Sequence, residues 1–356
     1  MNRSSRALGW GSVALVAVGC LALSLTPSAS EAAPPPDVPV EAGATEAPAA
    51  PEPATWRFRK HDRPVKLILV AGSIGAWPKQ PYAKQIERMC PRVETKNLSK
   101  VGMGAFALKQ RFKEQVLENR YIPFHDDELE FWLAFQGGLN SVGMPEKTNR
   151  YIRDLFVLAH RRGMSVLGLS LTPWGDATDK KRWVGANALR YKRSTQKIVD
   201  FVVGRSTPRQ ALGVHVAKRA DPDAPWSGEE LADVGIDLYD SPLRDPNAPT
   251  GDLEEARGQL RGDRRWLKAH AELSPEAKDA ALERDARELA NVQKWWLRPE
   301  LRSFDHIHPN VEGHTAMANW MCPQLPQSWG CSCPDAGGAV PPNEGAAPNV
   351  HTRPYF

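Results

Sequence analysis

The sequence feature that most constrains the fold is a repeated alternation of short strand-like runs with longer helical segments. Strands that alternate with helices in this way form a parallel sheet that is covered on both faces. We therefore predict a three-layer α/β/α sandwich around a central, mostly parallel sheet of five strands. The predicted strands are residues 65–71, 92–97, 128–136, 165–171 and 234–239, and the predicted helices are residues 81–89, 105–118, 146–162, 186–203 and 311–320.

The chain outside this alternation falls into segments of different composition. Its 356 residues suit one sizeable domain with additional segments. We place the domain at residues 59–325, after a Pro- and Ala-rich linker at 33–58 that cannot form a core. Residues 326–356 are rich in Pro, Gly and Ala toward their end and are predicted to be a disordered tail.

A highly charged helical segment, residues 252–298, is predicted to be an insertion into the domain. Its charges are typical of a solvated helix face, and a lid beside the sheet edge is the alternative. The candidate buried residues of this insertion are Trp266, Leu273, Leu282, Leu289 and Trp295.

Residues 1–32 have the features of a secretory signal peptide. A positively charged start precedes an apolar run at 13–25 that is too short to favour a membrane span, and small residues follow. We therefore predict a secreted or periplasmic protein without a stable membrane span after signal removal. Because residues 17–20 look like a lipobox, a lipoprotein anchored through Cys20 is the alternative.

Signal removal leaves four cysteines, which are Cys90, Cys322, Cys331 and Cys333. In an exported chain, four cysteines permit two disulfides with three possible connectivities. Cys331 and Cys333 are separated by one residue, so we do not expect them to pair with each other. Free or metal-bound thiols are the alternative, but no second Cys–His cluster with zinc spacing supports a metal.

A short segment near the end of the domain, residues 303–310, contains an acid, two imidazoles and a helix-start signal. Asp305 and His308 are three residues apart, so one tight turn can place the carboxylate against the ring. The carboxylate would then hold one ring nitrogen and leave the other free to accept a proton from a nucleophile. Asn310 is a favourable N-cap for the following helix, so we expect His308 on a loop held by a helix start.

Ser73 is the candidate nucleophile because it follows the first predicted strand and is flanked by glycines. Open α/β sheets place their chemistry at the carboxyl ends of strands. Right-handed crossovers bring these ends to one edge, where Gly102, Asn140 and the 303–310 turn also fall. A simple strand-to-helix turn is the alternative for Ser73, since the sequence lacks the G-x-S-x-G elbow of α/β-hydrolases.

Taken in order, these segments resemble the four motifs of the SGNH, or GDSL, hydrolase superfamily of esterases and acylhydrolases. Ala71-Gly72-Ser73 stands where the family has Gly-Asp-Ser, and the segment from Asn97 to Gly102 looks like the second motif. Gly138-Leu139-Asn140-Ser141 is similar to the Gly-x-Asn-Asp motif, and Asp305-His306-Ile307-His308-Pro309 matches Asp-x-x-His-Pro. The resemblance spans about residues 65–322.

The resemblance implies a flavodoxin-like fold and a serine esterase with a Ser-His-Asp triad. Ser73 would be the nucleophile, His308 the base and Asp305 the acid that orients it. The oxyanion hole would consist of the backbone N–H groups of Ser73 and Gly102 and the side-chain amide of Asn140. The resemblance implies no metal and no organic cofactor.

The predicted substrate is a carboxylic ester of a small molecule, a glycan or a lipid. Gly72 and Ser141 stand where the family has aspartates, which leaves a non-catalytic glycan-binding module as an alternative. An O-acyltransferase that uses the same triad is a second alternative. A nucleic-acid partner is not expected, because the net charge is only +4 and no dense basic run is present.

Other histidines and two tryptophans are further candidates for the site. His306 is an alternative base, and a metal site could combine His306, His308 and His314, although their spacing lacks the His-Glu-x-x-His pattern. Trp77 and Trp174 are candidates for lining a substrate groove, with hydrophobic packing as the alternative.

Overall fold

The centre of the fold is a sheet of five strands in the order β2-β1-β3-β4-β5. Every neighbouring pair of strands is parallel, so the predicted sheet is confirmed and is parallel throughout. The computed structural model describes residues 63–334. The predicted signal peptide, the linker and the tail beyond residue 334 lie outside the described residues. The strands are β1 (Val65–Ala71), β2 (Val93–Asn97), β3 (Glu130–Gln136), β4 (Ser165–Leu169) and β5 (Val234–Ile236).

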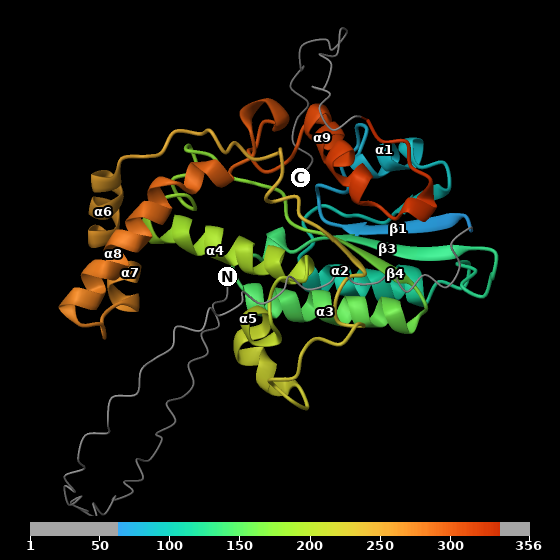
Figure 1. Cartoon of the computed structure of the whole chain (residues 1–356), viewed down its shortest axis with the longest axis horizontal. Helices are drawn as coiled ribbons and strands as arrows, with labels where there is room; N and C mark the ends of the chain where they lie inside the picture. Colours follow the sequence, from blue (N-terminus) through green and yellow to red (C-terminus); the bar gives the residue numbers. More distant parts are fainter. Residues whose placement is uncertain (1–62, 335–356) are drawn as a thin grey trace, which may run out of the picture. The chain divides into compact units, whose positions relative to one another are not determined.

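Different helices cover the two faces of the sheet (Figure 1). Side chains alternate along β1, so that Ile68 and Val70 enter one apolar core while Leu67 and Leu69 enter the other. The first core contains residues of α2 (Ala105–Phe112), α3 (Pro145–Arg161) and α4 (Gly185–Val202), and the second contains residues of α1 (Tyr82–Met89) and α9 (Val311–Met321). The predicted three layers are therefore present.

Element ends differ from the predictions by a few residues, for local reasons. The predicted helix 105–118 is α2 followed by a π-helical turn, Lys113–Leu117. The predicted strand 165–171 ends at Leu169, and the hydroxyl of the next residue, Ser170, accepts a hydrogen bond from Leu238 N at 2.8 Å. A short helix, α5 (Pro208–Leu212), follows α4.

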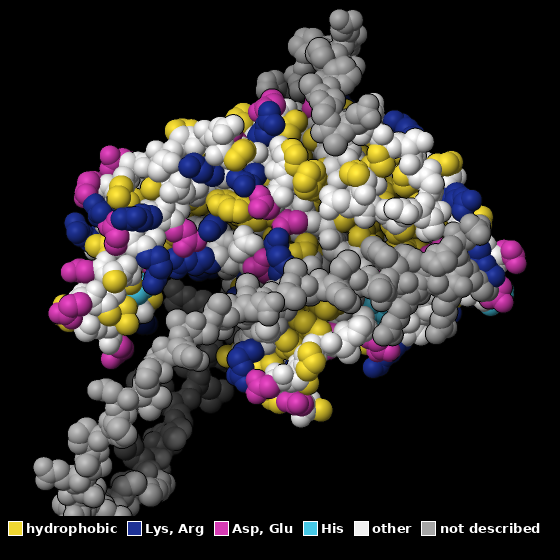
Figure 2. All heavy atoms as spheres, viewed as in Figure 1, with side chains coloured by type: hydrophobic (Ala, Val, Ile, Leu, Met, Phe, Trp, Pro, Cys, Tyr) yellow, Lys and Arg dark blue, Asp and Glu magenta, His cyan; other side chains and the backbone are white. Residues whose placement is uncertain are grey.

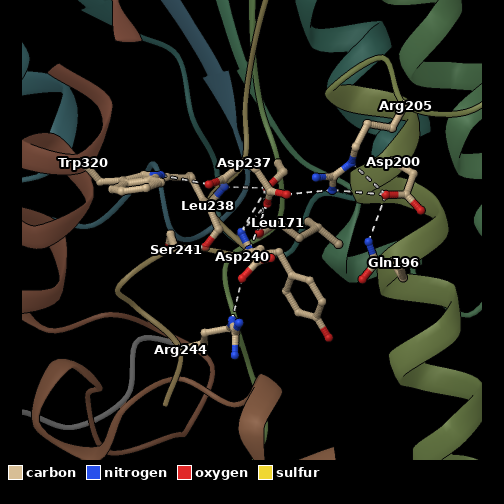
Figure 3. Close-up of polar contacts among 12 residues, drawn as sticks. Leu171, Gln196, Asp200, Arg205, Asp237, Leu238, Asp240, Ser241, Arg244 and Trp320 are labelled. Atoms are coloured by element: carbon tan, nitrogen blue, oxygen red, sulfur yellow. Dashed lines mark hydrogen bonds and ion pairs between the residues drawn. The ribbon is translucent and has the colours of Figure 1, made fainter. Parts of the chain in front are cut away.

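The loop after β5 joins the two helical layers through Asp237 (Figure 3). Its carboxylate accepts hydrogen bonds from the Ser170 hydroxyl at 3.2 Å and from Arg205, which follows α4, at 2.6 Å. Its backbone carbonyl accepts a hydrogen bond from Trp320 Nε1 of α9 at 2.9 Å. These contacts fix α9, which follows the 303–310 turn, relative to the ends of β4 and β5.

The predicted insertion consists of α6 (Leu253–Gly262), α7 (Arg264–Ala269) and α8 (Pro275–Ala290). The fully buried carboxylate of Asp285 on α8 pairs with Arg193 of α4 at 2.6 Å and accepts a hydrogen bond from Trp266 Nε1 at 2.9 Å. The insertion is therefore attached to α4 by a hydrogen-bonded buried charge. Figure 2 shows charged side chains of both signs interspersed on the face over these helices.

The buried residues predicted within the insertion are mostly correct. Trp266, Leu282 and Leu289 are buried, and Trp295 is half-buried and stacks on Tyr239 with ring centroids 5.1 Å apart. The prediction for Leu273 is wrong, because this side chain is 42% exposed. Leu273 lies in the turn between α7 and α8, where helical periodicity does not apply.

The boundary predicted for the tail at residue 326 is also wrong. Residues Gln327–Trp329 form a 3₁₀ helix, and Trp329 is fully buried with its ring edge-to-face against Trp132 at 5.1 Å. Two disulfides hold this segment, Cys90–Cys331 and Cys322–Cys333. Cross-links and a buried indole thus order a segment that its composition alone does not favour.

Within residues 63–334, the structure contains no helix with the length and apolar content needed to cross a membrane.

Candidate active site

Ser73 lies in a tight turn directly after β1. Gly72 N donates to the Gln136 carbonyl of β3 at 3.2 Å, and Ala76 N donates to the Gly72 carbonyl at 3.1 Å. Gly75 allows this turn to lie close to the sheet, because a Cβ there would be 2.5 Å from Ala71 Cβ. The serine is half-buried at the carboxyl end of a central strand.

The imidazole of His308 connects Ser73 to Asp305. His308 Nε2 lies 2.6 Å from Ser73 Oγ, and His308 Nδ1 lies 2.5 Å from Asp305 Oδ2. An ionised carboxylate can only accept hydrogen bonds, so Nδ1 carries the proton in the neutral ring and Nε2 accepts from the serine hydroxyl. The three side chains therefore form one hydrogen-bonded chain, although Ser73 and His308 are 235 residues apart.

Asp305 is held in its ionised state by several donors. Its Oδ1 accepts from the backbone N–H groups of His308 at 3.0 Å and Ile307 at 3.2 Å, and from the Ser303 hydroxyl at 3.1 Å. Burial raises the pKa of this carboxyl, but the hydrogen bonds from the ring and backbone of His308 and from the backbone of Ile307 outweigh burial and lower the pKa to about 2. Asp305 is therefore negatively charged at neutral pH.

The 303–310 turn is held at both ends. Ser303 N donates to the His308 carbonyl at 2.8 Å, and Arg302 and Pro309 form an antiparallel bridge. Asn310 caps α9 by accepting from Gly313 N at 2.8 Å, and its amide donates to the Glu300 carbonyl at 2.8 Å. The expected N-cap is therefore present, and it fixes the start of α9 next to His308.

Asn140 and Gly102 lie on the loops on either side of the Ser73 turn. Asn140 is in a 3₁₀ turn after β3, and its Nδ2 would lie 3.6 Å from a Cβ at Gly72. One hydrogen of its amide is donated to the Met103 carbonyl at 3.2 Å, and the amide has a second hydrogen to donate. Gly102 follows β2 with a φ of 79°, which favours glycine.

The two departures from the family motifs have different structural contexts. The Ser141 hydroxyl accepts from Ala105 N, at the start of α2, at 3.2 Å and donates to the Gly138 carbonyl at 3.2 Å. Ser141 thus links the Asn140 turn to α2. A Cβ at Gly72 would make only ordinary contacts, to Asn140 and to the Met103 carbonyl. Space alone does not require glycine at this position.

The rival histidines point elsewhere. His306 has a φ of 52°, and its Nε2 lies 3.7 Å from Asp179 Oδ2 in the loop after β4. His314 is fully buried in α9, and its Nδ1 accepts from Tyr82 N at 3.4 Å. The three histidines therefore have three separate sets of hydrogen-bond and ion-pair partners. Within residues 63–334, no group of three or more His, Cys, Asp or Glu side chains has a metal-binding arrangement.

The two candidate tryptophans differ in position. Trp174 is buried, packs edge-to-face on Trp183 with centroids 4.7 Å apart, and donates to the Thr195 hydroxyl at 3.0 Å. It belongs to the core, so packing is the correct interpretation for Trp174. Trp77 is half-buried and stacks on His308 with ring centroids 5.9 Å apart. No local sequence signal places Trp77 against His308, because the two residues lie at opposite ends of the domain.

Solved structures that are similar to this chain include several described as esterases or lipases. An acetyl xylan esterase is 15% identical, over 72% of this chain and 97% of that chain, with a TM-score of 0.37. A GDSL-like lipase from Bacteroides thetaiotaomicron is 13% identical over 75% and 88% of the two chains, with a TM-score of 0.36. A member of the lipolytic G-D-S-L family from Veillonella parvula is 12% identical over 72% and 96%, with a TM-score of 0.37.

No protein-family model matches the chain, and no curated protein sequence matches it. Likenesses at these identities and TM-scores do not by themselves assign an activity to the chain.

Proposed function

We propose that this protein is a serine hydrolase that cleaves carboxylic esters through an acyl-enzyme. The observation that carries the proposal is the chain of two hydrogen bonds from Ser73 Oγ through His308 to Asp305, at 2.6 and 2.5 Å. A serine hydroxyl is a weak nucleophile unless an adjacent base removes its proton. The base in turn needs a partner that fixes its tautomer and orientation.

In the proposed reaction, Ser73 Oγ attacks the acyl carbon as its proton moves to His308 Nε2. The ionised carboxylate of Asp305 stabilises the imidazolium that forms. The imidazolium then gives the proton to the leaving alcohol, and a water molecule activated by His308 hydrolyses the acyl-enzyme. The steps return every group to its starting state without a metal or organic cofactor.

The negative charge that develops on the acyl oxygen needs preorganised donors. We assign this role to the backbone N–H groups of Ser73 and Gly102 and to the amide of Asn140. Support for this assignment comes from the position of Asn140 beside Gly72 and from its second amide hydrogen. The carbonyl of Met103 accepts a hydrogen bond from the Asn140 amide at 3.2 Å and so holds this amide in place.

The substrate is proposed to be an ester of a small molecule, a glycan or a lipid that the enzyme meets outside the cytoplasm. The two disulfides support this location, because structural disulfides persist in oxidising compartments. The signal peptide and the alternative anchor at Cys20 remain predictions, since both lie outside the described residues.

Covalent labelling with a fluorophosphonate tests the proposal directly. The wild-type protein should be labelled at Ser73, and the Ser73→Ala variant should show no label. Ser227→Ala, an exposed serine before β5, is the matched control and should be labelled like the wild type. A wild-type protein that takes no label would contradict a serine hydrolase. With an added sugar acceptor, transfer that exceeds hydrolysis would instead favour an O-acyltransferase.

A further inference from the structure

Four aromatic rings form a column that starts at His308 and runs into the core between α1 and α9. Successive ring centroids, from His308 to Trp77, from Trp77 to His314 and from His314 to Tyr82, are each 5.9 Å apart. The successive interplanar angles are 22°, 27° and 16°, so the rings are roughly parallel. The mechanism above uses only the first ring of this column.

The inner end of the column is rigidly attached. Tyr82 and His314 are 1% and 0% exposed. Tyr82 N donates to His314 Nδ1 at 3.4 Å, and the Tyr82 hydroxyl donates to the side chain of Gln136, the last residue of β3, at 3.2 Å. Tyr82 and His314 are therefore fixed to β3, α1 and α9, and they support the Trp77 ring from the inner side of the column.

His314 stays neutral within this column, because burial, and to a lesser extent the positive charge of the His308 ring when it is protonated, lower its pKa to about 3. Trp77 therefore lies between the imidazole that takes part in the reaction and one that remains uncharged at neutral pH. The indole Nε1 of Trp77 is buried and has no hydrogen-bond partner among the described residues. Its contribution thus comes from the ring face rather than from a polar contact.

We propose that Trp77 is a positioning residue that holds the His308 ring with Nε2 directed at Ser73 Oγ. This inference rests on the proposed function. Asp305 fixes only Nδ1 of the His308 ring. The ring can still rotate about that hydrogen bond. The flat face of Trp77, supported by His314 and Tyr82, restricts this rotation. Small losses of alignment between a base and a nucleophile reduce rates strongly.

The test compares Trp77→Leu, which removes the flat face, with Trp77→Phe, which keeps it. Trp77→Leu should reduce kcat for a small ester by about ten- to a hundredfold while KM stays within about twofold. The rate of fluorophosphonate labelling should fall by the same factor, because labelling uses the same base. Trp77→Phe should recover both rates to within about threefold, since phenylalanine loses no hydrogen bond here.

Trp226→Leu is the matched control for loss of a half-buried indole. Trp226 lies between α5 and β5 and packs on Phe201 of α4, with ring centroids 5.2 Å apart. This variant should keep the wild-type kcat when it is assayed below its own unfolding temperature.

Three outcomes would overturn the inference. An unchanged kcat in Trp77→Leu would do so, as would a Trp77→Phe variant as slow as Trp77→Leu. A raised KM with unchanged kcat would assign Trp77 to substrate binding instead. None of these outcomes contradicts the proposed function, which fails if the wild-type protein takes no fluorophosphonate label or if Ser73→Ala keeps its activity.

Discussion

At the scale of single residues, His306 and His308 are only two positions apart but have different partners. His308 contacts Asp305 and Ser73, whereas His306 turns toward Asp179 through a backbone with positive φ. His306 lies inside the turn that the antiparallel bridge between Arg302 and Pro309 closes. Substitution of His308 should therefore affect activity far more than substitution of His306.

We expect His308→Ala to lose nearly as much activity as Ser73→Ala, on the order of 10⁶ in kcat, because base and nucleophile work as a unit. Asp305→Ala should lose less, since the imidazole remains. His306→Ala should stay within about tenfold of the wild type, or 1.4 kcal/mol of barrier. Initial rates on one small ester, with folding checked by circular dichroism, measure all four. An inactive His306→Ala together with an active His308→Ala would refute the assignment of the base.

Asn140→Ala tests the oxyanion donor. The loss of one such donor usually reduces kcat by roughly 10²–10³, with little change in KM. Asn119→Ala, between the π-helical turn Lys113–Leu117 and β3, is the control and should leave kcat unchanged. If Asn140→Ala retains full kcat, the amide does not contact the developing oxyanion.

The charge on Asp305 should contribute to stability in a pH-dependent way. Its pKa is about 2 in the folded protein and about 3.9 in an unfolded chain. Because the folded pKa is the lower one, the contribution of roughly 2 kcal/mol is fully present above about pH 4 and is lost as the pH falls toward 2. Urea unfolding between these pH values should show a larger fall in the free energy of unfolding for the wild type than for Asp305→Asn.

Asp223→Asn is the control for this measurement. Asp223 pairs with Arg209 on the surface, where both side chains are mostly exposed, and such pairs contribute little. The free energy of unfolding of Asp223→Asn should therefore change with pH in the same way as that of the wild type. Parallel curves for the wild type and Asp305→Asn would mean that Asp305 is not stabilised in its ionised form.

At the scale of elements, the start of α9 connects helix capping to the site. Asn310 caps α9 and also bonds the Glu300 carbonyl, so it holds both the helix and the chain that enters the 303–310 turn. Ser274 caps α8 in the insertion by accepting from Ala277 N at 3.2 Å. The two caps are similar locally but differ in their distance from His308 along the chain.

Asn310→Ala and Ser274→Ala should each cost about 1 kcal/mol of stability, the usual effect of losing an N-cap. Only Asn310→Ala should also reduce kcat, because the turn that carries His308 loses one of its anchors. Urea unfolding and initial rates on the same samples provide the comparison. Equal kcat values for the two variants would show that the cap does not position the base.

At the scale of the whole molecule, two disulfides close loops of very different length. Cys90 and Cys331 are separated by 241 residues, whereas Cys322 and Cys333 are separated by 11. Both join the last described segment to α1 and α9. A cross-link limits the unfolded chain more strongly when it closes a longer loop.

Replacing Cys90 and Cys331 by serine should therefore destabilise the protein more than replacing Cys322 and Cys333. Chain-entropy estimates are about 5 kcal/mol for the longer loop and about 3 kcal/mol for the shorter. Thermal unfolding of the two double variants shows which of them loses more stability. Thiol titration of the unfolded, unreduced protein should find few free thiols, and four free thiols would contradict both disulfides.

Local patterns in the sequence were sufficient to predict the five strands and the main helices, but not the short helix α5. The five strands and the helices that cover them were predicted to within a few residues, because apolar periodicity and turn residues act over short distances. The contact between Asp305 and His308 also depends on a spacing of three residues and was expected for that reason. The catalytic roles of these residues remain predictions until the variants are measured.

Only the tertiary structure decided which distant residues meet. The pairing of four cysteines was open in the sequence, and burial of Trp329 orders residues that composition had assigned to a tail. The same holds for Trp77, whose place against His308 depends on how the turn after β1 meets the start of α9. Such contacts arise from the packing of whole layers on the sheet, and no short segment of the chain contains both partners.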